Sequence, residues 1–143
     1  MTIVDLHIHS NHSDGRFSVN EIMEYASSHG IKYLSITDHD NIEAQQEAIN
    51  IKEEYEIQYF PGVELNVVFS HPNINKGKDI TLDLLGYCYD HTNSEFIEKL
   101  QIISDYRKQR MRKIIEKLNI KLESEGENFT LLTENDAKKI EES

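Results

Sequence analysis

The chain has 143 residues, of which 38% are hydrophobic and 29% are charged, a balance typical of one globular domain. Its 15 basic and 26 acidic residues give a net charge of −11, which argues against general binding to nucleic-acid phosphates. We find no apolar run of membrane-spanning length and no signal-peptide pattern, and the single cysteine, Cys88, cannot form an internal disulfide. We therefore expect one cytoplasmic domain that covers residues 1–143 and does not bind a membrane.

Two strand–helix units are predicted in the first 55 residues. Residues 2–7 are apolar and β-branched, as expected of a strand, and Ser18 with Glu21 forms a capping box that opens a helix ending at Gly30. Residues 31–37 predict the next strand. A second helix is expected from about Asp40 to residue 55.

The rest of the chain continues the same alternation. Residues 57–69 predict a third strand, bent at Pro61, and residues 71–77 predict a loop. A fourth strand is expected over residues 80–87, followed by a long amphipathic helix that begins near residues 92–95, and by a short helix from about Thr133. Strands that alternate with helices indicate an α/β fold with about four parallel strands.

Potential metal ligands lie near the ends of the predicted strands. His7 and His9 lie two residues apart on the first strand, so their side chains share one face and can converge on a cation. Such a pair also arises by coincidence in a chain with seven histidines. Its place at the carboxyl end of a strand favours a functional site, because parallel α/β folds gather their ligands there.

The later strands carry similar side chains. His39 follows the second strand between two aspartates, Glu64 lies in the third and Asp83 in the fourth. Each has an alternative explanation: Asp40 can cap its helix, Glu64 can be solvated, and His39 can pair with the preceding aspartate. Asp14, before a glycine, can be an ordinary turn residue. The set as a whole favours a metal centre.

Four short signatures occur in succession: Asp5-Leu6-His7-Ile8-His9-Ser10 with Ser13-Asp14-Gly15, Thr37-Asp38-His39-Asp40, Pro61-Gly62-Val63-Glu64 and Leu85-Gly86-Tyr87. In order and spacing the chain resembles the PHP (polymerase and histidinol phosphatase) family, especially its nucleotide phosphoesterase-like members. The resemblance implies the N-terminal portion of a distorted (β/α)₇ barrel. It also implies one to three divalent ions, manganese, zinc or iron.

The resemblance further implies which residues bind these ions and support catalysis. His7, His9 and Glu64 correspond to ligands of one metal, Glu64 also bridges to a second, and Asp14 and His39 correspond to ligands of a third. Asp83 stands where a sixth ligand is normally a histidine. Its oxygen ligand shifts preference from zinc towards manganese or magnesium.

The last three ligands of the family pattern have no counterpart before Ser143, and His71-Pro72 copies only part of one late signature, in a predicted loop. About four of seven strands would leave open sheet edges. We expect a homo-oligomer or a partner protein to cover them. Folding of the long helix over the opening, or a longer protein of which this is a fragment, are the alternatives.

The family resemblance implies hydrolysis of phosphate esters in nucleotides or short oligonucleotides. Seven basic side chains between residues 107 and 121 form either a solvated helix face or a phosphate-binding surface, and Arg16 and Arg107 are candidate substrate contacts. Two other functions compete with a phosphoesterase. One is a non-catalytic metal-binding or assembly module, and the other is an amidohydrolase, for which the expected lysine ligand is not apparent.

Overall fold

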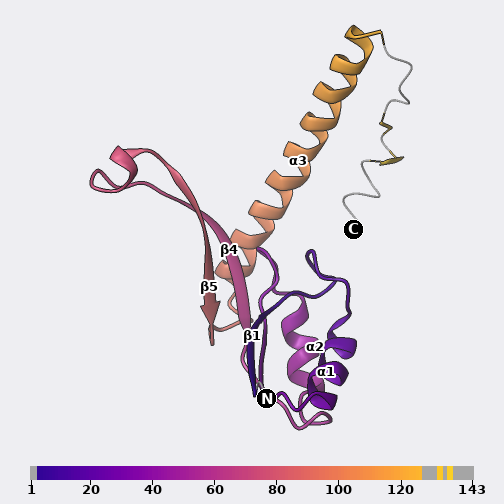
Figure 1. Cartoon of the computed structure of the whole chain (residues 1–143), viewed down its shortest axis with the longest axis vertical. Coiled ribbons are helices and arrows are strands. Elements are labelled where there is room, and N and C mark those ends of the chain that lie inside the picture. Colours follow the sequence, from indigo (N-terminus) through magenta and orange to yellow (C-terminus); the bar gives the residue numbers. More distant parts are fainter. Residues whose placement is uncertain (1–2, 127–131, 134, 137–143) are drawn as a thin grey trace. The chain divides into compact units, whose positions relative to one another are not determined.

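The computed structural model describes residues 3–126, 132–133 and 135–136 of the chain (Figure 1). It divides the chain into two compact units, Met1–Ile97 and Glu98–Ser143. In the part of the chain that is described, no helix is both long and apolar enough to cross a membrane. The candidate ligands all belong to the first unit.

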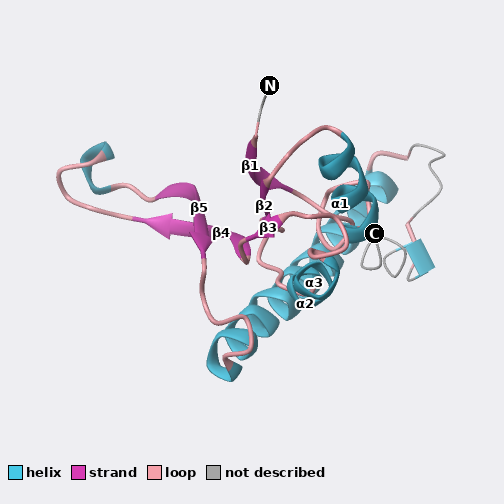
Figure 2. Ribbon diagram, turned by 90° about the horizontal axis from the view of Figure 1, so that it is seen from below, coloured by secondary structure: helices cyan, strands magenta, loops and turns pink. Residues whose placement is uncertain are grey.

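Three parallel strands form the first sheet: β1 (Val4–Ile8), β2 (Tyr33–Ile36) and β3 (Gln58–Tyr59), in that order. Helices α1 (Val19–Ser28) and α2 (Ala44–Ile51) connect them, and Figure 2 shows these elements by type. Buried residues of α1, α2, β2 and β3 make up the hydrophobic core, including Met23, Leu34 and Ile36. The predicted α/β fold with parallel strands is thus confirmed for this part of the chain.

Helix α1 begins and ends as its sequence predicts. The Ser18 amide donates a hydrogen bond to Glu21 Oε2 at 2.8 Å, and the Glu21 amide donates one to Ser18 Oγ at 3.4 Å. The hydrogen bonds from the Ser18 backbone and then from its hydroxyl hold the pKa of Glu21 below its usual value. Beyond the helix, Gly30 has a φ of 77°, which is the left-handed conformation that ends many helices.

The two remaining strands correct the prediction of four parallel strands. Strands β4 (Gly62–Phe69) and β5 (Ile80–Tyr87) form a separate antiparallel pair, with Glu64 opposite Leu85. The segment between them is a loop with one short 3-10 turn, η1 (Asn75–Gly77). A parallel connection needs a crossover of a dozen or more residues, usually through a helix, so this loop permits only a hairpin.

The predicted strand over residues 57–69 is two strands in different sheets, because the chain bends at Phe60-Pro61. Gln45, fully buried in α2, holds the bend: its Nε2 donates to Gly62 O at 2.9 Å, and its Oε1 accepts from the Gly62 amide at 3.2 Å. A Cβ on Gly62 would lie 2.1 Å from Ser35 Oγ. Only glycine fits at this close approach of β4 to β2.

Helix α2 begins four residues later than predicted. Asp40 has a φ of 47°, which is left-handed backbone and cannot start a helix, and its Oδ1 accepts a hydrogen bond from the Asn66 amide at 3.1 Å. Asn41 Oδ1 then accepts from the Glu43 amide at 2.7 Å in a local turn. Asp40 therefore contacts β4 and does not cap α2.

Helix α3 (Ser94–Ser124) carries the basic residues noted between 107 and 121. Asn93 Oδ1 accepts from the Phe96 amide at 2.9 Å, which caps the start of the helix inside the predicted region of residues 92–95. Of the short helix predicted from Thr133, Asn135 and Asp136 are helical, and the rest of that segment lies outside the described residues.

Candidate metal centre

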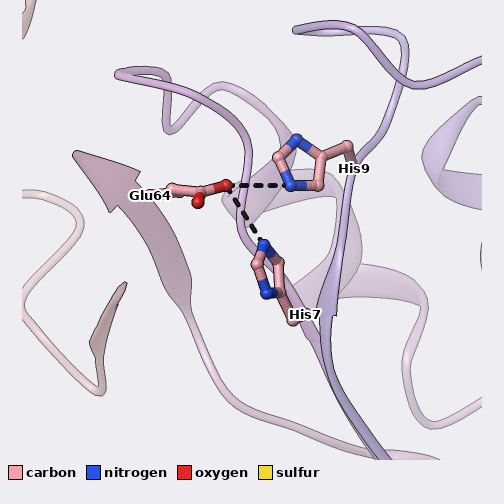
Figure 3. Close-up of side chains that lie close together, drawn as sticks. All are labelled: His7, His9 and Glu64. Atoms are coloured by element: carbon pink, nitrogen blue, oxygen red, sulfur yellow. Dashed lines mark hydrogen bonds and ion pairs between the residues drawn. The ribbon is translucent and has the colours of Figure 1, made fainter. Parts of the chain in front are cut away.

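The ends of β1 and β4 bring His7, His9 and Glu64 together (Figure 3). His7 lies in β1 and His9 follows its last residue, and their rings are 5.3 Å apart. Glu64 Oε2 lies 3.1 Å from His7 Nε2 and 3.0 Å from His9 Nε2. Two imidazoles at the end of β1 and one carboxylate of β4 are thus close enough to bind one ion.

A second group of potential metal ligands, His9, Asp14 and His39, shares His9 with the first. Asp14 Oδ1 lies 2.9 Å from His9 Nδ1, and Asp14 Oδ2 lies 3.8 Å from His39 Nε2. Asp14 lies in the turn after β1, where a Cβ on Gly15 would lie 2.1 Å from His9 O. This tight turn directs Asp14 back towards His9, so Asp14 is more than a solvated turn residue.

A third group contains His39, Glu64 and Asp83, whose potential ligand atoms lie within 4.8 Å of one another. His39 Nδ1 lies 3.5 Å from Glu64 Oε2. Asp83 stands directly opposite Asn66 in the β4–β5 pair and accepts a hydrogen bond from Asn66 Nδ2 at 2.8 Å. The hairpin, and not a parallel strand, places Asp83 on the same sheet face as Glu64.

The donor atoms fit a divalent cation. His9 Nδ1 is buried and, despite its closeness to Asp14, makes no hydrogen bond within the described residues. A buried imidazole nitrogen without a hydrogen-bond partner is unusual in a folded protein and is well suited to bind a metal. Imidazole nitrogens with carboxylate oxygens form the mixed set that manganese, zinc and iron accept.

The centre is buried on one side and accessible on the other. The Glu64 side chain is 7% exposed, whereas the side chains of His7 and Asp14 are 49% and 70% exposed. An anionic ligand can therefore approach past His7 and Asp14. Tyr87 lies on the face of β5 that carries Asp83 and donates a hydrogen bond to Leu6 O at 2.8 Å.

The predicted substrate contacts stay predictions. Arg16 is exposed in the loop that follows Asp14, and Arg107 lies in α3. His71 is in the loop between β4 and β5, as predicted. His91 is in a turn, where its Nε2 lies 3.3 Å from Gln46 Oε1.

Three residues around the centre make contacts that sequence reasoning did not predict. Asp38, expected as a possible partner of His39, instead accepts hydrogen bonds from the loop after β1. Burial, and then the nearby Glu64 carboxylate, raise the pKa of Tyr87. Asn66 pairs with Asp83, and its position two residues after Glu64 on one strand face was the available signal.

Comparison with known proteins gives consistent results. A family model described as PHP domain matches residues 5–141. The chain is 31% identical over 114 residues to a 5'-3' exoribonuclease of Haemophilus influenzae, covering 80% of this chain and 39% of that protein. It is 27% identical over 114 residues to a 3',5'-nucleoside bisphosphate phosphatase of Chromobacterium violaceum, covering 80% and 37%. The chain thus spans less than two fifths of the length of these curated relatives.

A solved structure of an amidohydrolase from Chromobacterium violaceum, with bound sulfate and no metal, resembles the chain with a TM-score of 0.70 and 26% identity. The match covers 88% of this chain and 40% of that one. The arrangement of strands and helices described above is therefore shared with a longer α/β protein.

Proposed function

Because this chain belongs to the PHP domain family, we propose that it is a metal-dependent phosphoesterase that hydrolyses phosphate esters of nucleotides or short oligonucleotides. The convergence of six potential ligands from β1, β4, β5 and two loops is the observation that carries the proposal. The similarity to an exoribonuclease and to a nucleoside bisphosphate phosphatase supports this class of substrate. The substrate would be a phosphorylated small molecule or a short nucleic acid.

We assign the residues as follows. His7, His9 and Glu64 would hold one divalent ion, and Asp14 with His39 would hold another. His9 would join the second ion through Nδ1 only when its Nε2 does not bind the first, because a neutral imidazole has one nitrogen lone pair to donate. Glu64 would be shared with a further position that includes Asp83, whose oxygen favours manganese or magnesium over zinc. Divalent ions in such a site supply positive charge for phosphate oxygens and lower the pKa of bound water.

The chain's own contribution is to hold the ligands rigidly and to leave one side accessible. Burial of Glu64 keeps water from solvating its carboxylate, while the exposed sides of His7 and Asp14 leave room for a phosphate group. Arg16 and Arg107 are proposed phosphate contacts, because a guanidinium donates two parallel hydrogen bonds to such oxygens.

A second copy of the chain, or a partner protein, is proposed to complete the centre and cover the sheet edges. The observation that supports this is the small size of the two sheets, whose edge strands offer backbone groups to a partner strand. Size-exclusion chromatography with light scattering tests the homo-oligomer. A stable, folded monomer with full activity would exclude completion by a second copy.

The activity test is release of phosphate from a nucleoside 3',5'-bisphosphate and of mononucleotides from 5'-phosphorylated short oligoribonucleotides, with and without Mn²⁺. His7→Ala and Glu64→Gln should each lower turnover at least about 100-fold, a loss typical of groups that hold the reacting centre. His29→Ala is the matched control for the histidine, because His29 is exposed at the end of α1 and stacks on Tyr25. Equal turnover in all three variants would refute the site.

A non-catalytic metal-binding or assembly module is the second candidate. It is favoured by the sharing of His9, His39 and Glu64 between overlapping groups, which leaves few ligands for each ion. Stoichiometric manganese without turnover on either substrate would support this candidate and reject the phosphoesterase.

A further inference from the structure

Asp38 is a fully buried carboxylate beside the metal centre, and the ligand assignments above do not use it. Its Oδ1 accepts hydrogen bonds from the Ser10 amide at 2.7 Å and from Ser13 Oγ at 2.6 Å. Its Oδ2 accepts one from Ser10 Oγ at 2.6 Å. Distances this short are typical of charge-assisted hydrogen bonds to a carboxylate.

These hydrogen bonds fix the turn that carries Asp14. Ser10 is fully buried, and its carbonyl accepts from the amides of Ser13 and Gly15 at 3.1 and 3.0 Å. Asp38 therefore holds the two serines on either side of this turn, one residue after His9 and one residue before Asp14. A shift of the turn would move Asp14 relative to His9.

The backbone of Asp38 fixes the other side of the centre. Asp38 O accepts from the Glu64 amide at 3.2 Å, and the Asp40 amide donates to Glu64 O at 2.8 Å, so residues 38–40 run beside the start of β4. His39 lies between these two hydrogen bonds. One residue thus connects the turn that bears Asp14 with the segment that bears His39.

We propose that Asp38 is a positioning residue that holds Asp14 and His39 at the separation needed to bind one divalent ion together with His9. The inference rests on the proposed metal centre and adds a residue that does not itself bind the ion. A carboxylate suits this role because its two oxygens accept from three donors. An asparagine has one acceptor oxygen and would place an amide group where Ser10 Oγ now donates.

The test measures binding of Mn²⁺ alone, by the electron paramagnetic resonance signal of the free ion, to the full chain freed of metal. Ser13→Ala is the main variant, because it removes the 2.6 Å hydrogen bond to Asp38 from a partly exposed residue and leaves both bonds from Ser10. The contact of Ser13 Oγ with Asp14 Oδ1, which is lost as well, is a marginal one at 3.5 Å, and Asp38→Asn leaves it in place. Asp14→Ala identifies which phase of the Mn²⁺ titration comes from the ion held by His9, Asp14 and His39, here called the Asp14-dependent step. Ser28→Ala, on the exposed end of α1, is the matched control.

Ser13→Ala and Asp38→Asn should each weaken the Asp14-dependent step about 10-fold or more, the usual effect of losing a group that orients a metal ligand, and should leave other steps within about twofold. In the Asp14→Ala background, Ser13→Ala should have no further effect on Mn²⁺ binding, because the group it positions is already gone. A purely structural role would lower the melting temperature in both backgrounds without this selective, non-additive loss.

The inference fails if folded Ser13→Ala and Asp38→Asn bind Mn²⁺ as the unaltered chain does, or if Ser13→Ala weakens all steps equally. If Asp38→Asn does not fold, Mn²⁺ binding by Ser13→Ala is the deciding measurement. An unaltered chain that binds no Mn²⁺ would instead reject the metal-dependent function itself, and the positioning role with it.

Discussion

Replacing Gln45 by leucine should destabilise the first unit strongly, because this fully buried amide holds the start of β4. Two donors would lose their acceptor: the Gly62 amide at 3.2 Å and the Tyr59 hydroxyl at 2.6 Å from Gln45 Oε1. At roughly 1–3 kcal/mol for each unsatisfied buried group, the free energy of unfolding should fall by about 2–6 kcal/mol. Gly62 O would keep the hydrogen bond from the Tyr89 hydroxyl, so it adds little to this cost, whereas Ile36 O would lose the bond from Gln45 Nε2 at 3.2 Å, which places the loss towards the upper part of this range.

Urea unfolding of metal-free protein, followed by circular dichroism, measures this loss. With a urea m-value of roughly 1–3 kcal/mol/M, the midpoint should fall by on the order of 1 M or more with the slope unchanged. Gln46→Leu is the matched control, since the neighbouring amide is exposed and its contacts are at the surface: Nε2 donates to Asn50 Oδ1 on the same helix, and Oε1 lies 3.3 Å from His91 Nε2. This substitution should change stability by less than about 0.5 kcal/mol. Equal midpoints for the two variants would refute the reasoning.

Four further outcomes are expected. Gly15→Ala should weaken Mn²⁺ binding, because its Cβ would lie 2.1 Å from His9 O and displace the turn; an unchanged dissociation constant would contradict this. Ser35→Ala should leave the urea midpoint unchanged or raise it, since the Ser35 hydroxyl is buried without a hydrogen-bond partner among the described residues. A clear drop in the midpoint would show that the hydroxyl does make a stabilising hydrogen bond. Ser18→Ala should destabilise α1, because it removes the hydroxyl that accepts from the Glu21 amide and that adds to the Ser18 backbone amide in lowering the pKa of Glu21. The second contribution is fully present above the usual pKa of a glutamate and shrinks as the pH falls through the lowered pKa, so a difference from the unaltered chain that is wholly independent of pH would argue against the bond from the hydroxyl to Glu21. Mn²⁺ at 100 times its dissociation constant should raise the free energy of unfolding by about 2.7 kcal/mol over protein in EDTA, and the absence of any rise would show that the folded chain does not bind the ion selectively.

The local features of the fold could be predicted because they depend on neighbouring residues. The capping box of Ser18 and Glu21, the end of α1 at Gly30 and the strand that bears His7 all follow from residue types a few positions apart. The start of α2 could not be predicted in this way. Asp40 has the sequence of a helix cap, but its hydrogen bond to the Asn66 amide comes from a strand distant in the chain.

The sequence by itself identified which side chains can bind a metal, because imidazoles and carboxylates at successive strand ends are a chemical property of the chain. Only the tertiary structure decided how they group. The hairpin turns Asp83 onto the face of Glu64, and the buried carboxylate of Asp38 fixes the turn of Asp14. Both depend on hydrogen bonds between residues 17 to 28 positions apart, and no local pattern in the sequence specifies such pairings.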